Sequence, residues 1–135
     1  RAHFEINTLG PALLIKHLHK LLPKNRRGIL IVLTARVGSI GDNNLGGWIS
    51  YRTSKAAVHQ IIRTSALEIK NKYKESICIA LHPGTVKTSL TQKYVGKHPS
   101  VSPNQSAKNI LNVINSLSQK DTGNFFDWAG NKVEW

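Results

Sequence analysis

Two short, unbroken apolar runs constrain the fold more than any other feature of this sequence. Residues 29–33 read Ile-Leu-Ile-Val-Leu, and residues 76–81 read Ser-Ile-Cys-Ile-Ala-Leu. Short apolar runs that are rich in β-branched residues and lack alternation are typical of strands buried on both faces of a parallel sheet. Two parallel strands need a long crossover between them. The apolar positions of residues 51–70 recur at helical spacing, so this segment supplies the crossover.

The rest of the chain continues the alternation of helices and strands. Helical spacing predicts one helix over residues 2–22 and another over residues 103–117, with Pro103 in its first turn. Residues 123–128 predict a third strand, and residues 89–102 are polar and irregular, as expected of a flap. The order helix, strand, helix, strand, helix, strand predicts an α/β fold with a parallel sheet.

Composition excludes several classes of protein. The chain has 135 residues, of which 40% are hydrophobic, so it can form one packed domain rather than a disordered tail. Its single cysteine, Cys78, excludes a disulfide framework, and its six histidines lack the spacing of a metal site. No apolar run is long enough to span a membrane, and the charged start at Arg1 is unlike a signal peptide. We therefore expect a cytoplasmic protein without a metal or a membrane partner.

The net charge of +12 raises the question of a polyanionic partner. The basic residues gather at the ends of the helical segments, in clusters within residues 20–27 and 70–74. Cations at the carboxyl end of a helix are favourable through the helix dipole alone. We therefore expect no nucleic acid partner. A basic nucleic-acid binder is the alternative, and salt-dependent binding to duplex DNA would reveal it.

Candidate chemistry lies beyond the carboxyl ends of the strands, where parallel sheets bind their ligands. Tyr51 and Lys55 stand there, four residues apart at the start of a predicted helix, and so they share one helix face. A nearby ammonium favours the phenolate and lowers the pKa of a tyrosine, which makes the tyrosine a usable proton donor and acceptor. Taken alone, such a pair is more often an ordinary helix start than a catalytic one.

The context of this pair resembles one protein family. Residues 51–57 read Tyr-Arg-Thr-Ser-Lys-Ala-Ala, residues 82–88 read His-Pro-Gly-Thr-Val-Lys-Thr, and residues 7–11 read Asn-Thr-Leu-Gly-Pro. In this order and spacing they resemble the short-chain dehydrogenase/reductase family. A narrower resemblance, to the C-factor-like and sniffer-like carbonyl reductases, is carried by residues 35–43, the Gly-Gly-Trp run at 46–48 and Trp135.

The resemblance implies an NAD(P)-dependent oxidoreductase that acts on a small carbonyl or alcohol substrate. Tyr51 matches the family's proton donor and acceptor, and Lys55 matches the lysine that lowers its pKa and binds the nicotinamide ribose. Asn7 matches the asparagine that holds a water in a proton relay to the lysine. The loop that lines the nicotinamide is matched by Pro83, Gly84, Val86 and Thr88. The cofactor is NAD or NADP, and the net charge slightly favours NADP.

One physical observation supports the role of Asn7. Pro11 lies four residues later and has no N–H, so the Asn7 carbonyl lacks its usual helical donor. A buried carbonyl without that donor needs another partner, such as an ordered water. In the alternative interpretation, Pro11 lies in a first helical turn and Asn7 caps the helix.

The serine of the family pattern is missing from its usual place. The family places a serine just past the first of these strands to hold the substrate carbonyl, and that position is Ala35 here, preceded by Thr34. Ser39 is the substitute that we predict, because a glycine-rich loop can bend it toward Tyr51. Without any hydroxyl in this role, roughly 2.7–4 kcal/mol of transition-state stabilisation would be lost.

The family's glycine-rich dinucleotide-binding turn has no counterpart in residues 1–135, and the sequence contains no methionine. We therefore expect a single partial domain, the carboxyl-terminal half of a doubly wound, Rossmann-like dinucleotide-binding fold. The resemblance also implies a homodimer or homotetramer formed through the helices at 2–22 and 51–70. A half without a pyrophosphate site leaves a second function open, that of a non-catalytic interaction module.

Overall fold

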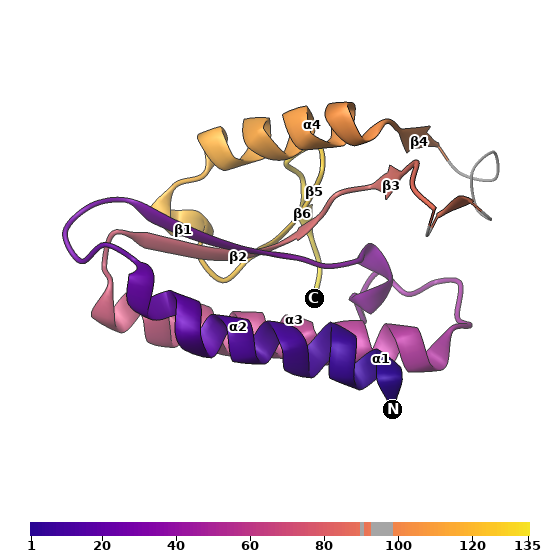
Figure 1. The fold of residues 1–135 in the computed structure, drawn as a ribbon, viewed down its shortest axis with the longest axis horizontal. Coiled ribbons are helices and arrows are strands. Elements are labelled where there is room, and N and C mark those ends of the chain that lie inside the picture. The colour runs from indigo at the N-terminus through magenta and orange to yellow at the C-terminus, as the bar shows by residue number, and fades with distance from the viewer. Residues whose placement is uncertain (90, 93–98) are drawn as a thin grey trace.

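The chain folds around a mostly parallel sheet that has helices on both faces. A computed structural model describes residues 1–89, 91, 92 and 99–135. Helices α2 (Gly10–Leu18) and α3 (Ile49–Lys72) run along one face of the sheet, and α4 (Pro103–Ser116) runs along the other (Figure 1). This arrangement confirms the predicted α/β fold with a parallel sheet.

The remaining elements are short. The strands are β1 (Gly28–Leu33), β2 (Ser76–His82), β3 (Thr85–Val86), β4 (Ser100–Val101), β5 (Phe125–Asp127) and β6 (Lys132–Val133). The short helical turns are α1 (Ala2–Phe4), the π-helical turn η1 (Glu5–Leu9), and the 3₁₀ turns η2 (His19–Leu21), η3 (Arg36–Gly38) and η5 (Gln119–Asp121).

The strand order of the main sheet is β1-β2-β5-β6. β1 and β2 pair in parallel, from Gly28 beside Ser76 to Leu33 beside Leu81. β5 continues in parallel beside the end of β2, whereas β6 returns antiparallel to β5. The sequence did not indicate β6, because a strand of two residues carries no periodic pattern. The sheet is therefore parallel except at the β6 edge.

A second, parallel pair joins β3 and β4. β4 lies within the stretch 89–102, which the sequence predicted as an irregular flap. Residues 90 and 93–98 of that stretch lie outside the described residues.

Two apolar clusters pack on the two faces of β2. On the α3 side, Cys78 and Ala80 join a cluster that includes Ile15, Val58, Ile62, Ala66, Ile69, Tyr73 and Phe125. On the α4 side, Ile77, Ile79 and Leu81 join Val113, Leu117 and Phe126. The side chains of β2 from Ile77 to Leu81 are at most 1% exposed, so this strand is buried on both faces as predicted.

The prediction that the strand is buried on both faces is wrong for most of β1. Residues 29–32 are only half-buried, and Leu33 is exposed. The reason is that β1 forms an edge of the sheet in the described part of the chain, with β2 as its one neighbour there.

The first helical segment is interrupted, where the sequence predicted a continuous helix over 2–22. In the π-helical turn η1, the Gly10 N–H donates to the carbonyl of Glu5, five residues back. α2 then begins with Gly10 and Pro11, so the wide turn lies directly before the proline that lacks an N–H. None of the described helices has both the length and the apolar character to cross a membrane.

The turn η3 packs against α3 with no room for a side chain. A Cβ built on Gly38 would lie 2.6 Å from the Cβ of Lys55 and 2.8 Å from its carbonyl carbon. Glycine is required here because the backbones of η3 and α3 approach so closely.

We therefore predict that Gly38→Ala lowers the free energy of unfolding of the natural full-length protein by about 1–3 kcal/mol, because backbone atoms must move. Gly10→Ala is the matched control. Its Cβ would meet only the Glu5 carbonyl oxygen at 3.6 Å, and alanine favours a helix by roughly 0.5–1 kcal/mol. Urea unfolding followed by circular dichroism measures both variants. Wild-type stability of Gly38→Ala would contradict the close approach.

Candidate active site

The predicted site residues gather at one edge of the sheet. β1 ends at Leu33 and β2 ends at His82, and the chain leaves both strands at the same edge. α3 begins there at Ile49, after Trp48, which has a φ of 49° and forms the turn into the helix. The first turns of α3 therefore lie at the carboxyl ends of the strands, where a parallel sheet binds its ligands.

Tyr51 and Lys55 lie together in these turns. The Lys55 Nζ is 5.7 Å from the centre of the Tyr51 ring, and both side chains are half-buried. Burial lowers the pKa of Lys55, because a partly desolvated ammonium is less stable than one in water. The ring of His3 packs edge-on against Tyr51, with 5.7 Å between ring centres. The helical spacing thus places a cation beside a phenol, as the sequence predicted.

Asn7 reaches the same turn of α3 from the first helical segment. Its Nδ2 donates to the Oγ of Ser54 at 3.1 Å, and this Oγ donates to the carbonyl of Tyr51 at 2.8 Å. The neighbouring Thr8 hydroxyl donates to the carbonyl of Ser54 at 2.9 Å. The buried Ser54, which the sequence analysis did not single out, therefore joins Asn7 to the part of α3 that contains Tyr51 and Lys55.

Ser39 lies in the loop that follows β1. Its side chain is buried, and its Oγ accepts the N–H of Asp42 at 3.0 Å. The loop is closed by the Arg36 guanidinium, which donates to both carboxylate oxygens of Asp42, at 2.6 and 3.0 Å. Ala35 precedes this loop directly after the end of β1. The recorded bond of the Ser39 hydroxyl is thus within the loop, and its role toward a substrate stays a prediction.

The segment after β2 contains the residues predicted to line a cofactor. Gly84 has a φ of 75°, and a Cβ there would lie 2.9 Å from Cδ1 of Trp128, so only glycine fits. The Pro83 carbonyl accepts the hydroxyl of Ser106 at 3.4 Å. Val86 belongs to β3, and the Thr88 N–H donates to a neighbouring hydroxyl after it. This segment therefore leaves the sheet edge in a fixed conformation.

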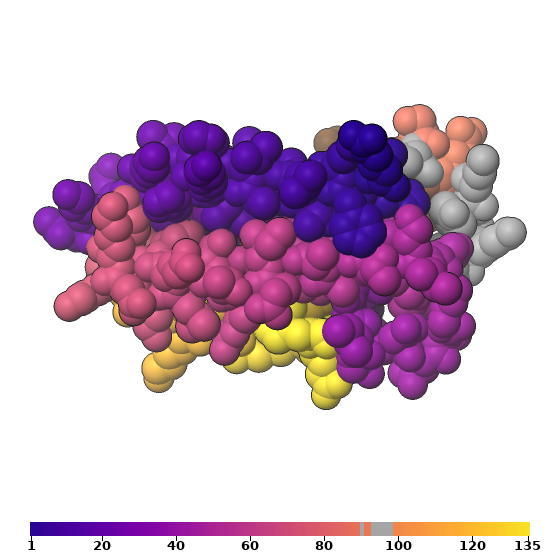
Figure 2. Space-filling model, turned by 90° about the horizontal axis from the view of Figure 1, so that it is seen from below, coloured from indigo at the N-terminus to yellow at the C-terminus, as the bar shows by residue number. Residues whose placement is uncertain are grey.

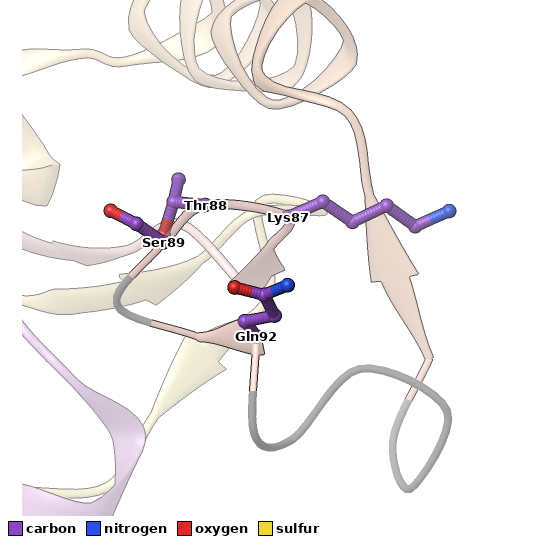
Figure 3. A pocket seen from close by; sticks show the side chains of 4 residues that line it. All are labelled: Lys87, Thr88, Ser89 and Gln92. Carbon is purple, nitrogen blue, oxygen red and sulfur yellow. The ribbon is translucent and has the colours of Figure 1, made fainter.

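A hollow of about 560 Å³ opens beside Thr88. It is lined by Lys87, Thr88, Ser89 and Gln92, and Figure 3 shows Lys87 and Ser89 pointing in opposite directions from the segment. All four lining residues have polar side chains, and the hollow is open to solvent. Within the described residues, no three His, Cys, Asp or Glu side chains come together as a metal site.

Arg52 was not predicted as a site residue, yet it holds the glycine loop at three points. Its Nε lies 3.1 and 3.0 Å from the carbonyl oxygens of Gly46 and Gly47, and its Nη1 donates to the carbonyl of Val37 at 3.0 Å. A cation in the first turn of a helix opposes the helix dipole. That unfavourable placement is the sequence signal that points to Arg52 as a residue with a special partner.

His59 was also missed. It is 3% exposed, and its Nε2 lies 2.9 Å from the Thr34 hydroxyl at the end of β1. Burial lowers the pKa of His59 to about 4, the charge of Lys55 adds to this shift, and the backbone of Gly38 opposes it. The Nδ1 makes no hydrogen bond within the described part of the chain. The signal in the sequence was its position four residues after Lys55.

Fold and site together define an α/β protein with a Tyr–Lys pair at the carboxyl edge of a parallel sheet. The family model described as short chain dehydrogenase matches residues 1–98, and the chain belongs to this family.

Relatives and solved structures match over nearly the whole chain. It is 36% identical to 1-hydroxy-2-glutathionyl-2-methyl-3-butene dehydrogenase of Rhodococcus sp. (strain AD45), over 100% of this chain and 58% of that protein. Carbonyl reductase Sniffer of D. melanogaster has a TM-score of 0.81 and 26% identity, and covers 98% of this chain. An NADPH-bound carbonyl reductase from chicken fatty liver has a TM-score of 0.80 and 31% identity, also over 98%. The likeness to Sniffer agrees with the narrower resemblance seen in the sequence.

The chain spans just over half the length of these proteins, since the matches cover 55% of each of the two solved structures.

The depressed pKa of His59 predicts how stability depends on pH. The folded imidazole takes up a proton only near pH 4, whereas in the unfolded chain it does so near 6.5. Because the unfolded state binds more protons in this window, the free energy of unfolding falls as the pH falls from 6.5 toward 4. A shift of this size corresponds to on the order of 3 kcal/mol.

Denaturant unfolding of the natural full-length protein between pH 7 and pH 4 checks this prediction. His59→Gln removes the ionisable ring and should flatten the dependence, whereas His17→Gln, at an exposed position, should leave it unchanged. Part of the slope should remain in both variants, since burial also lowers the pKa of His82. Equal slopes for wild type and His59→Gln would contradict the assignment.

Proposed function

We propose that this chain carries the catalytic half of an NAD(P)-dependent oxidoreductase that interconverts a carbonyl and an alcohol on a small molecule. The observation that carries the proposal is the placement of the Lys55 ammonium beside the Tyr51 ring, in the turn of α3 to which Asn7 is joined through Ser54 and the main-chain carbonyl of Tyr51. Membership in the short-chain dehydrogenase family and the likeness to two carbonyl reductases support it. The glycine-rich pyrophosphate site would come from sequence outside this partial domain.

In this proposal Tyr51 moves the proton. Its hydroxyl gives a proton to the carbonyl oxygen during reduction, and its phenolate takes the alcohol proton during oxidation. Lys55 stabilises the phenolate by its charge, and partial burial strengthens that effect because less water screens it. By the family resemblance, Asn7 holds a water that passes protons to Lys55; the missing N–H of Pro11 no longer supports this role, since Pro11 lies in the first turn of α2 after the π-helical turn.

The residues present fit the nicotinamide-ribose end of a dinucleotide, which would supply or take the hydride. Lys55 is half-buried, and the ion pairs of the described residues do not include it. Its ammonium can therefore donate to the hydroxyls of a ribose. Pro83, Gly84, Val86 and Thr88 would line the nicotinamide. We propose NADP rather than NAD, because the matched chicken structure contains NADPH and the chain has a net charge of +12.

Tyr51→Phe tests the proton transfer, because it removes the hydroxyl and keeps the ring. We expect kcat of the natural full-length protein to fall about 10²–10⁴-fold, the usual contribution of a positioned acid or base. The dissociation constant for NADPH should change little, since the ring still packs in place. NADPH oxidation with a panel of small aldehydes and ketones measures the first quantity, and fluorescence titration measures the second.

Tyr73→Phe is the control for this experiment, because Tyr73 is buried at the opposite end of α3. It should retain wild-type turnover. Unchanged turnover in Tyr51→Phe would remove Tyr51 from the mechanism. A wild-type protein that neither binds NADPH nor turns over any carbonyl, yet assembles stably, would favour the non-catalytic interaction module instead.

We further propose that the protein assembles as a homodimer or homotetramer through α2 and α3. These helices lie side by side on one face of the molecule (Figure 2). The first helical segment exposes large apolar side chains there, each between 56% and 79% accessible: Ile6, Leu9, Leu13, Leu14 and Leu21. Large apolar side chains exposed together on one helical segment are typical of an interface between subunits.

Introducing negative charge on this apolar surface tests the assembly. Leu9→Glu/Leu13→Glu places two carboxylates on exposed positions of one helix face, so it should convert an oligomer to a monomer without unfolding the chain. Lys16→Glu, an exposed polar position of α2, is the control and should leave the mass unchanged. Size-exclusion chromatography with light scattering measures both. A monomeric wild type at micromolar concentration would overturn the proposal.

A further inference from the structure

His59 stands in line with the two residues of the proposed proton transfer. Tyr51, Lys55 and His59 follow one another at intervals of four on α3, so they lie on one face of the helix. Tyr51 and Lys55 reach toward the open carboxyl edge, whereas His59 is buried one turn deeper, at 3% exposure. A buried imidazole with an unpaired Nδ1 is less favourable than an apolar side chain of similar size. Its contacts explain what it does there.

His59 joins α3 to the end of β1 and to the last residues of the chain. Its Nε2 and the Thr34 hydroxyl are 2.9 Å apart, which ties the helix to the residue before Ala35. Its ring packs on those of Phe125 and Trp135, with 4.5 and 5.3 Å between ring centres. These contacts hold the imidazole at two places, at the residue that follows β1 and at the rings of Phe125 and Trp135.

The His59 ring also packs against the turn η3. A Cβ on Gly38 would lie 2.8 Å from the Cε1 of His59, so the backbone of Gly38 rests directly on the imidazole. The main-chain oxygen of Trp135 accepts the N–H groups of Ile40 and Gly41, at 3.1 and 3.0 Å. The segment 34–41 is therefore held at its start by His59 and at its end by Trp135, which itself packs on His59.

We propose that His59 is a positioning residue: through its bond to Thr34 and its contact with Trp135, it holds the segment 34–41 against the turn of α3 that carries Lys55. This inference rests on the proposed function and adds to it a residue that touches neither substrate nor cofactor. The segment contains Ala35 and Ser39, the positions at which a carbonyl would be held. Its distance from Tyr51 and Lys55 thus depends on His59.

Substitutions at the two partners of the Thr34–His59 hydrogen bond test the proposal in the natural full-length protein. Thr34→Val and His59→Leu remove the bond. Thr34→Ser keeps the hydroxyl, and His59→Gln keeps an amide near the position of Nε2. We expect the first two variants to lower kcat at least about tenfold, since displacements near 1 Å have effects of this size or larger. The two conservative variants should restore most of the activity.

Two further readouts separate positioning from a purely structural role. The limb of the kcat/KM pH profile that reports Tyr51 should shift in Thr34→Val, because displacement of Gly38 from its packing against Lys55 changes the burial of the ammonium beside the phenol. The dissociation constant for NADPH should stay within about twofold, because the variant changes neither Lys55 nor the segment 83–88, the residues proposed to bind the cofactor. The double variant Thr34→Val/His59→Leu should be no worse than His59→Leu alone, since His59→Leu already removes the bond to Thr34.

A Thr34→Val protein with a lower melting temperature but wild-type kcat and pH profile would overturn the proposal. If His59→Leu fails to fold, Thr34→Val and Thr34→Ser still test the proposal, because valine and serine each differ from threonine by one small group. The outcome is separate from that of Tyr51→Phe. Loss of turnover in Tyr51→Phe with no effect in Thr34→Val rejects only the role of His59, whereas normal turnover in Tyr51→Phe rejects the proposed function itself.

Discussion

The packing of α3 against β2 is the interaction on which the candidate site depends. Its buried stripe consists of Ser54, Val58, His59, Ile62, Ala66 and Ile69. This stripe begins one turn after the helix start, so the first turn of α3 extends past the core to the carboxyl edge of the sheet. The parallel register of β1 with β2 brings the ends of both strands to the same edge. One packed helix therefore both covers the sheet and places Tyr51 and Lys55 where the loops after the strands converge.

Ser54 connects the first helical segment to this arrangement. It is fully buried, it takes a hydrogen bond from Asn7, and its hydroxyl and carbonyl are both engaged. The wide π-helical turn η1 contains both Asn7 and Thr8, which make these bonds. A π turn rotates the residues after it relative to a regular helix. The irregular turn before Pro11 thus makes the side-chain hydrogen bonds of the segment to α3, whereas α2 buries Ile15 and leaves Leu13, Leu14 and Leu18 exposed.

The sequence predicted those elements that show a pattern within a single segment, and it missed features that depend on residues far apart in the chain. The apolar run of β2 and the spacing of α3 were sufficient, because burial on both faces and helical periodicity are visible in single segments. The burial of β1 was mispredicted, since an apolar run does not reveal whether a neighbouring strand lies on each side. η1 was missed because a π turn has the same apolar spacing as an α-helix over five residues. The bonds of Arg52 and His59 join residues 5 to 25 positions apart, and no local pattern encodes such pairs.

Because Ala35 has no hydroxyl, the predicted hydrogen bond to a substrate carbonyl would have to come from another hydroxyl of the loop. Thr34 faces His59, so its oxygen is turned toward the core rather than the open edge. Ser39 accepts the N–H of Asp42, but a serine hydroxyl that accepts one hydrogen bond still has its own O–H to donate. The Asp42 bond therefore orients Ser39 without using its proton. Arg36 and Asp42 close the same loop through an ion pair, so the loop around the Ser39 oxygen is held by this ion pair and by the Asp42 N–H. A donor held in this way would need little reorganisation if charge developed on a carbonyl oxygen, so Ser39 remains our predicted substitute for the serine that is missing at Ala35.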